Sequence, residues 1–305
     1  MKLSGILSRL LLGFLLLSPL PLACLTWLYT QAFEKTLTEM IEDKLSAIAD
    51  KKADQITNYL DERQDDLRQL ARSSQTVNVL RRLAGGKSDR SAADYRQSLG
   101  SFFDSTAYAD LLLIDHAGNI VFTFKGSLSL DHNLYDRTLA DSELTNAHRK
   151  ALDLLDMHMT PVYVHYGKPS IYLVMPVFDG SRTLGSAVLE LNLETLKTVA
   201  SDTTGLGISG ETVLAQVDNE GLLYVSSLRK ESGAAFNKRL DFNNAAPPMQ
   251  SALQGGHGQG ITRDYANMPV IGAWRYLPML EWGMVVKIDL AEALAPADTL
   301  RTYTF

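Results

Sequence analysis

Two segments with the same strand–turn–strand pattern recur about one hundred residues apart, and this repeat limits the possible fold more than any other feature of the chain. Leu113–Val121 reads LIDHAGNIV and Gln216–Tyr224 reads QVDNEGLLY, so a polar turn that ends in glycine separates two apolar stretches in each. Glycine readily adopts the positive φ that such turns require. The second segment starts 103 residues after the first. The repeat therefore predicts a duplicated unit built on a β-sheet.

Each unit continues with a second pair of predicted strands. A Met-Pro-Val tripeptide begins this pair at Met175 in one unit and at Met268 in the other, and a helix-like segment follows at Glu194 and at Glu292. The sequence therefore predicts an α+β fold, with a first module over residues 87–200 and a second module over residues 201–300.

The segment before the two modules has the pattern of one long amphipathic helix. From Thr30 to Leu83 there is neither proline nor glycine, and apolar residues recur mostly at steps of three, four or seven. We expect this helix to occupy residues 30–86 and to end at Gly85 and Gly86. Its apolar stripe can pack on the modules, on the same helix of a second copy in a homodimer, or on both.

The first 29 residues have the features of a membrane anchor. Lys2 and Arg9 precede Leu10–Tyr29, an uncharged apolar run of the length that a helix needs to cross a bilayer. The positive charge before this run predicts that the N-terminus lies in the cytoplasm and that the residues after Tyr29 lie outside it. A cleaved signal peptide is the alternative, because Pro19 and Pro21 could close a short apolar core, but no clear cleavage site follows.

The composition and the motifs exclude several function classes. The chain has 29 basic and 35 acidic residues and no cluster of Lys and Arg, so a nucleic-acid surface is not expected. Phosphate-loop, zinc-protease and nucleophile-elbow motifs do not occur, so we expect neither catalysis nor a cofactor. Asp153, Asp156 and His158 have no further ligands at a metal-binding spacing. Gly255–Gly260 is expected to be a flexible loop.

Several segments resemble the double Cache sensory domains, over Thr30–Arg301. The resemblance implies two stacked PAS-like modules with antiparallel sheets on a long helix, in the sensory region of a transmembrane chemoreceptor, histidine kinase, cyclase or phosphatase. It also implies that the first module is distal from the membrane, that the second is proximal, and that residues 301–305 approach a second span. The segments that carry the resemblance are Gly205–Thr212 (GLGISGET), Pro269–Pro278 (PVIGAWRYLP) and Glu281-Trp282-Gly283.

The resemblance further implies where a ligand binds. Family members that bind amino acids hold the ligand in the distal module with a Tyr and an Arg, a Trp, a later strand Tyr, and an Asp that neutralises the amine. The matching positions here hold Tyr135, Arg137, Tyr163 and, in place of the Asp, Glu190, whereas no Trp follows Arg137. The full set of candidate ligand-binding residues is Tyr135, Arg137, Tyr163, His165, Tyr172 and Glu190.

The chemistry of these residues predicts a small organic anion or an amino-acid-like metabolite as the ligand. A guanidinium binds a carboxylate through paired hydrogen bonds, and tyrosines supply rigid walls with polar tips. Three alternatives remain. Arg137 could form a surface salt bridge with Asp131 or Asp136. The second module could bind the ligand near Tyr265 and Arg275. The chain could also be a membrane-tethered structural domain without a small ligand.

Overall fold

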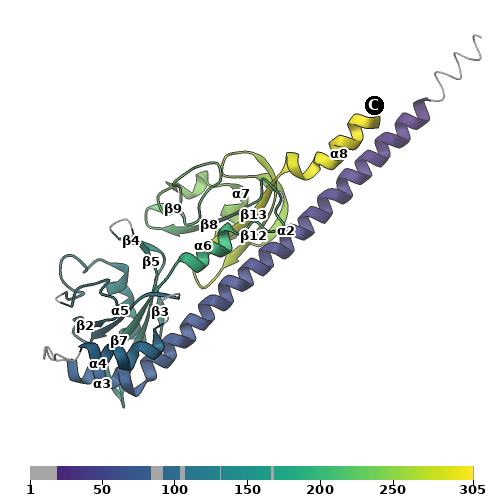
Figure 1. Ribbon diagram of the computed structural model, residues 1–305. Coiled ribbons are helices and arrows are strands. Elements are labelled where there is room, and N and C mark those ends of the chain that lie inside the picture. Colours follow the sequence, from purple (N-terminus) through teal and green to yellow (C-terminus); the bar gives the residue numbers. More distant parts are fainter. Residues whose placement is uncertain (1–18, 84–91, 104–106, 131, 166–167, 305) are drawn as a thin grey trace, which may run out of the picture.

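The computed structural model describes residues 19–83, 92–103, 107–130, 132–165 and 168–304, and Figure 1 shows their arrangement. In chain order the elements are α2 (Pro19–Arg72), α3 (Ser74–Leu83), α4 (Ala92–Leu99), η1 (Gly100–Phe102), β1 (Tyr108–Asp115), β2 (Ile120–Thr123), α5 (Glu143–Leu154), β3 (His158–Met159), β4 (Tyr163–His165), β5 (Lys168–Ser170), β6 (Tyr172–Asp179), β7 (Arg182–Leu191), α6 (Glu194–Ser201), β8 (Glu211–Asp218), β9 (Gly221–Tyr224), β10 (Arg239–Leu240), η2 (Phe242–Asn244), α7 (Pro247–Leu253), β11 (Gly258–Arg263), β12 (Pro269–Leu277), β13 (Trp282–Asp289) and α8 (Leu290–Thr304).

Two antiparallel sheets have the same strand order, as the repeat in the sequence predicts. The first module contains the sheet β2-β1-β7-β6-β3, and the second contains β9-β8-β13-β12-β11 with β10 added at one edge. The turns at Gly118 and Gly221, which join β1 to β2 and β8 to β9, have φ of 86° and 120°. Each glycine therefore provides the backbone conformation that the turn needs. The short strands β4 and β5 form a separate hairpin.

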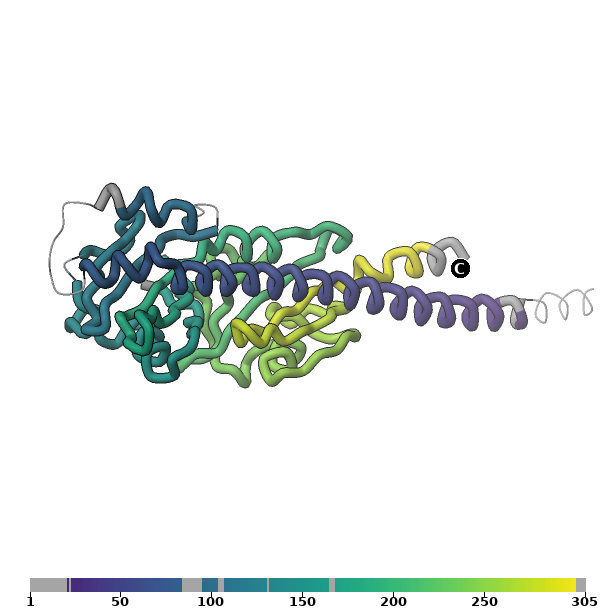
Figure 2. Tube along the Cα trace, turned by 90° about the horizontal axis from the view of Figure 1, so that it is seen from below, coloured from purple at the N-terminus to yellow at the C-terminus, as the bar shows by residue number. Residues whose placement is uncertain are grey.

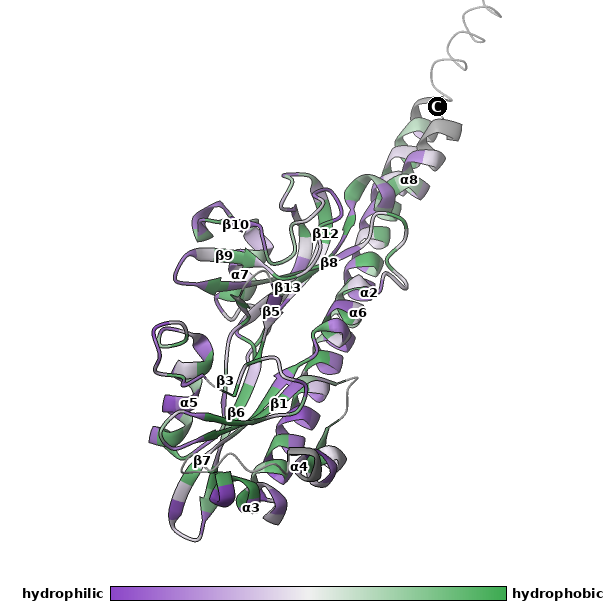
Figure 3. Ribbon diagram, turned by 60° about the vertical axis from the view of Figure 1, so that its left-hand side comes forward, coloured by the Kyte–Doolittle hydropathy of each residue, from purple (hydrophilic) through white to green (hydrophobic). Residues whose placement is uncertain are grey.

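Helix α2 runs along both modules and covers one face of each sheet (Figures 1 and 2). Figure 3 shows hydrophobic and hydrophilic residues alternating along it. Its buried residues belong to one apolar cluster that also contains residues of both sheets, such as Leu189 of β7 and Met284 of β13. The predicted apolar stripe is thus confirmed, and it joins the two modules into one core. The stripe consists of Leu45, Ala49, Ile56, Leu60, Leu67 and Leu70.

The opposite face of each sheet is covered by a short helix and its own apolar cluster. Helix α5 lies on the first sheet with Leu144, Ala147 and Ala151 buried. Helix α7 lies on the second sheet, where Met249 packs with Val285. The candidate ligand residues Tyr172 and Glu190 lie on the α5 side of the first sheet.

The long helix is interrupted at Ser73, which corrects the prediction of one continuous helix to Leu83. α2 ends at Arg72 and α3 begins at Ser74. The Ser73 hydroxyl accepts a hydrogen bond from the backbone N–H of Thr76 at 3.1 Å. Serine favours this N-cap position because its side chain replaces a missing backbone partner. The predicted end of the helix at Gly85 and Gly86 lies outside the described residues.

The glycine-rich segment that was expected to be a loop is partly a strand. Gly258–Gly260 begins β11, and Gly258 lies opposite Trp274 of β12. A Cβ atom at Gly258 would lie 2.7 Å from the Trp274 ring, so only glycine leaves room for this indole. The prediction of a loop is wrong for Gly258–Gly260, which belong to the strand, and at Gly258 the glycine allows close packing against β12.

Both ends of the described chain lie at the same end of the molecule. Helix α8 packs beside the first half of α2, and both extend away from the modules (Figure 1). Across the described residues, no helix combines the length and the apolar character needed for a membrane span. Much of the predicted span Leu10–Tyr29 lies outside the described residues, which begin at Pro19.

Candidate ligand-binding site

Glu190 is more deeply buried than Tyr135, Arg137, Tyr163 and Tyr172. Its strand β7 lies at the centre of the first sheet, where Glu190 pairs with Asp110 of β1 on one side and with Tyr172 of β6 on the other. Residues that pair directly across strands project to the same face. The three side chains therefore form a row on the α5 side, and Glu190 is only 1% exposed.

The two carboxylate oxygens of Glu190 differ in their hydrogen bonding. Oε1 accepts the Ser170 hydroxyl at 2.7 Å and the Lys168 ammonium at 3.0 Å, both from strand β5. Oε2 is buried and has no hydrogen-bond partner among the described residues. A buried acceptor without a partner is costly, and more so when it is charged. Glu190 thus has the capacity to accept a further donor.

Asp110 lies beside Glu190 but has no such capacity. Its carboxylate accepts the Thr123 hydroxyl at 2.7 Å and the backbone N–H groups of Phe124, Lys125 and Ser127 at 2.7–3.0 Å. Burial raises the pKa of Asp110, but these hydrogen bonds outweigh burial and hold its pKa below the usual range. Asp110 therefore stays ionised and fixes the loop that follows β2.

Two tyrosines stand next to the Glu190 carboxylate. Tyr172 is 7% exposed, and its pKa is raised by burial first and by the charge of Glu190 second. Its hydroxyl therefore remains protonated. Tyr163 of β4 pairs with Ser170 of β5 and also acts on the pKa of Tyr172. The structure brings Tyr163 of the β4–β5 hairpin close to Tyr172 and Glu190 of the sheet.

Tyr135 lies at the other end of this face. Its ring packs on Gly118, just beyond the end of β1, because a Cβ at Gly118 would lie 2.6 Å from it. Asp110, the residue that pairs with Glu190, lies five residues before Asp115, the last residue of β1. At the usual rise per strand residue, Asp110 and Asp115 are about 16 Å apart. The structure therefore does not bring Tyr135 together with Glu190.

The other two candidates differ from the expected arrangement. Arg137 lies in an exposed turn before α5, and within the described part of the chain it forms no ion pair, including with Asp136. Asp131, the other predicted salt-bridge partner, lies outside the described residues. His165 ends β4, where its backbone pairs with Lys168. The predicted set is thus divided between two ends of one sheet face.

His148 is a polar core residue that the sequence analysis missed. It lies on α5 with no exposed surface, and its Nδ1 is 2.7 Å from the Ser186 hydroxyl of β7. Burial lowers its pKa to about 4, so the ring is neutral near pH 7. Its Nε2 has no hydrogen-bond partner among the described residues. The signal was present, because Leu144, Ala147, His148 and Ala151 follow the spacing of one helix face.

The second module holds an internal ion pair on the corresponding two strands. Glu211 of β8 pairs with Lys287 of β13, next to Val213 and Val285, whereas Asp110 of β1 pairs with Glu190 of β7. The Lys287 ammonium lies 3.1 Å from Glu211 and 2.8 Å from Asp264, and Lys287 is 1% exposed. The second module thus supplies its own buried cation, where the first module places two carboxylates.

At the alternative site, Tyr265 and Arg275 both make internal contacts, and Tyr265 also lines a small pocket with Tyr224 and Val285. The Tyr265 hydroxyl contacts both oxygens of Glu211 at 3.1 Å and accepts the Lys230 N–H. Arg275 forms a salt bridge to Asp50 of α2. These side chains are committed to internal contacts. Among the described residues, no group of three His, Cys, Asp or Glu side chains is placed so that it could hold a metal ion.

Comparison with known proteins supports the same architecture. The model of the Cache domain family matches residues 30–297. The ligand-binding domain of the Pseudomonas aeruginosa amino acid chemoreceptor PctB in complex with L-Gln has a TM-score of 0.53 at 17% identity, over 86% of this chain and 98% of that chain.

Two further solved structures are similar. The sensor domain of the V. cholerae histidine kinase DctB has a TM-score of 0.57 at 14% identity, over 82% of this chain and 98% of that one. The ligand-binding domain of the Pseudomonas fluorescens chemoreceptor CtaA with L-isoleucine has a TM-score of 0.55 at 14% identity, over 86% and 98%. A search of the curated proteins found no match. Because the family model spans most of the sequence, the chain belongs to the Cache domain family of ligand-binding sensor domains.

Proposed function

We propose that this sensor region binds a small molecule with a protonated amine, and that Glu190 in the first module receives the amine. The observation that carries the proposal is the buried Glu190 Oε2, which has no hydrogen-bond partner among the described residues. On the corresponding strands of the second module, the buried carboxylate of Glu211 is neutralised by the Lys287 ammonium. An ammonium group from a ligand would supply the same charge to the first module.

The chemistry of similar proteins supports an amino-acid-like ligand. PctB and CtaA are described in complex with L-Gln and L-isoleucine, and each of these amino acids carries an ammonium group. The predicted contact between Arg137 and a ligand carboxylate is not part of this proposal, because Arg137 lies in the turn beside Tyr135, away from Glu190. We therefore propose a zwitterionic or cationic metabolite, held at its amine by Glu190 and flanked by Tyr163 and Tyr172.

The remaining parts of the proposal concern the setting of the sensor. We propose that Leu10–Tyr29 anchors the chain in the bacterial inner membrane, that the modules lie outside the cytoplasm, and that the chain forms a homodimer through α2. Helices α2 and α8 lie side by side and run antiparallel, and this supports the setting because it brings both ends of the described chain to the same end of the molecule (Figure 1). The domain limits of 87–200 and 201–300 remain part of the same proposal.

The contacts between the modules offer a path for the signal. The Gln216 side chain of β8 accepts the Val162 N–H at 3.1 Å and donates to the Val162 carbonyl at 2.9 Å. Val162 directly precedes the β4–β5 hairpin, whose Lys168 and Ser170 contact Glu190. A ligand amine that displaces Lys168 would shift the hairpin, and the second module would follow through Gln216. Such a shift requires that the ligand bind the shifted arrangement of the hairpin more tightly than the unshifted one.

Glu190→Gln is expected to abolish binding of the amine while the fold is kept, because glutamine has nearly the same shape without the charge. A thermal-shift screen of residues 30–301 with amino acids, amines and small carboxylates tests this. A ligand at about 100 times its dissociation constant adds about 2.7 kcal/mol to the free energy of unfolding. Glu39→Gln, an exposed position on α2, is the matched control and keeps full stabilisation.

Two other outcomes of the screen are informative. If a stabilising amine acts equally on the wild type and on Glu190→Gln, the proposed amine site is wrong. If no small molecule stabilises the wild type, the structural alternative without a ligand is favoured. Arg137→Ala is measured in the same series and should bind the amine like the wild type, because Arg137 lies away from Glu190.

Lys168→Ala is expected to strengthen amine binding severalfold. The Lys168 ammonium lies 3.0 Å from Glu190 Oε1, although its side chain is 61% exposed, so it competes with a ligand amine for the same carboxylate. Removing it also frees the hairpin to move. Isothermal titration calorimetry with an amine found in the screen measures the change. Lys197→Ala, on exposed α6, should leave the affinity unchanged.

A further inference from the structure

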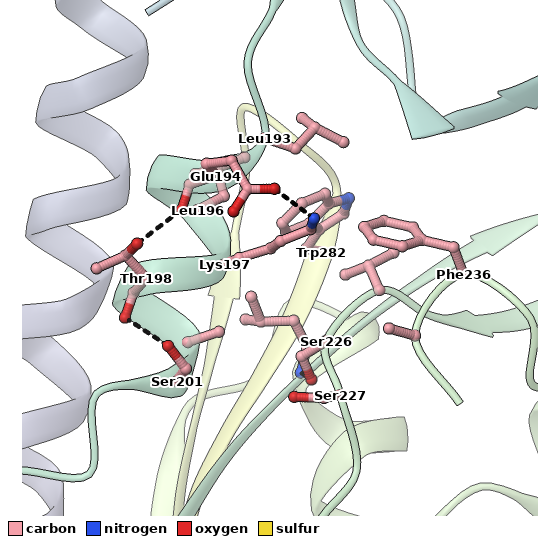
Figure 4. Close-up of a pocket in the computed structure, with 14 residues that line it drawn as sticks. Leu193, Glu194, Leu196, Lys197, Thr198, Ser201, Ser226, Ser227, Phe236 and Trp282 are labelled. Atoms are coloured by element: carbon pink, nitrogen blue, oxygen red, sulfur yellow. Dashed lines mark hydrogen bonds and ion pairs between the residues drawn. The ribbon is translucent and has the colours of Figure 1, made fainter. Parts of the chain in front are cut away.

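A cavity lies between α6 and the sheet of the second module, and Glu190 is not among its lining residues. It has a volume of about 300 Å³. In Figure 4 the labelled residues of α6 face Phe236, Ser226 and Ser227 across it, with Trp282 at the wall between them. Helix α6 connects the two modules, so the cavity lies at their junction. Small-molecule sites favour such junctions between structural units.

The lining of this cavity is apolar and aromatic, with no unpaired charge. Trp282 and Leu214 are each 2% exposed, and Phe236 adds a second aromatic wall. The two charged residues at the rim, Glu194 and Lys197, pair with each other at 2.6 Å. An ionic ligand would lose its hydration without gaining a free counter-charge. The cavity therefore favours a neutral occupant.

One buried hydroxyl provides a polar contact. Ser226 is 5% exposed, and its Oγ accepts the Leu214 N–H at 2.9 Å. Its hydroxyl proton has no acceptor among the described residues and can be donated to a ligand. The occupant should therefore carry one hydrogen-bond acceptor.

We infer that this cavity is a binding site for a neutral aromatic molecule of one or two rings with one acceptor atom. The size follows from volume, because a cavity of about 150 Å³ holds benzene. Flat rings match the Trp282 and Phe236 walls. The site is separate from the proposed amine site, and it does not depend on that proposal.

An occupant of this cavity would touch the residues that connect the modules. The Trp282 indole N–H donates to Gln216 Oε1 at 3.1 Å, and Gln216 holds Val162 of the first module. On the other side, Lys52 of α2 donates to the carbonyl of Asp202, at the end of α6. The ligand would thereby stabilise one arrangement of α6 between α2 and the second sheet, and so bias the sensor.

Titration with quinoline tests the inference, because quinoline is neutral near pH 7 and has two rings and one acceptor nitrogen. We expect saturable heat of binding to the wild type by calorimetry. Ala235→Phe fills the cavity from a partly exposed position and should weaken binding by roughly tenfold or more. The control Ala266→Phe, in an exposed turn outside the cavity, should bind like the wild type.

Glu190→Gln separates this inference from the proposed amine site. Quinoline should bind this variant as it binds the wild type, whatever the variant does to amine binding. The inference is overturned if quinoline shows no saturable binding to the wild type, or if Ala235→Phe and Ala266→Phe bind it equally well. Circular dichroism of each variant confirms that the fold is kept.

Discussion

Replacing Lys287 by methionine is expected to lower the free energy of unfolding by about 3–5 kcal/mol. The Lys287 ammonium is buried between Glu211 and Asp264, at 3.1 and 2.8 Å. Burial alone lowers the pKa of Lys287, but the hydrogen bond to Asp264 and the charge of Glu211 outweigh it and raise the pKa. Lysine thus stays charged, and its removal leaves two buried carboxylates without their main counter-charge.

Urea unfolding of the wild type and the variant measures this loss. Lys230→Met is the matched control, because Lys230 lies 3.7 Å from the same Asp264 but its side chain is 31% exposed. We expect that change to cost less than about 1 kcal/mol. Lys287→Met combined with Glu211→Gln and Asp264→Asn should recover much of the stability. Equal losses for Lys287→Met and Lys230→Met would contradict the role of burial.

The stabilising role of Lys287 also has a defined pH range. Because the folded state raises the pKa of Lys287, its contribution is complete below the pKa of lysine in the unfolded chain, about 10.4. The contribution is lost only as the pH rises through the higher pKa of the folded state. The wild type should therefore keep this advantage over Lys287→Met throughout the neutral range.

The architecture could be predicted because its signals are local. The turn glycines Gly118 and Gly221 and the apolar stripe of the long helix depend on residues close in sequence, so the repeat and the helix were recognisable. The interruption at Ser73 was missed because absence of proline and glycine does not guarantee a continuous helix. A single serine that caps the next turn is enough to end one.

The candidate site was harder to predict because it depends on register between distant strands. Tyr172 and Glu190 were identified, and they are paired across β6 and β7. Tyr135 lies in a loop, and its ring contacts Gly118. No local pattern in the sequence shows that this contact places Tyr135 far from Glu190. Lys287 was missed for a related reason, since a charged residue in a strand is usually assigned to the solvent face.

Asp110→Asn is expected to destabilise the first module by about 3 kcal/mol or more, since hydrogen bonds to charged groups contribute roughly 1.5–3 kcal/mol each. The Asp110 carboxylate gathers the N–H groups of Phe124, Lys125 and Ser127 around acceptor oxygens. Asparagine replaces one oxygen by an NH₂ group, which cannot accept a hydrogen bond from a backbone N–H. Hydrogen exchange should therefore show lost protection at these amides before the rest of the sheet.

The pH dependence of stability provides a second test of Asp110. Its pKa is lowered in the folded state, so its contribution is complete above the pKa of aspartate in the unfolded chain, about 3.9, and is lost as the pH falls through the lower folded value. The wild type should thus lose its advantage over Asp110→Asn below about pH 4. Asp54→Asn, on the exposed side of α2, should follow the wild type at every pH. A constant difference between the wild type and Asp110→Asn down to the lowest pH would mean that the charge of Asp110 does not hold the loop.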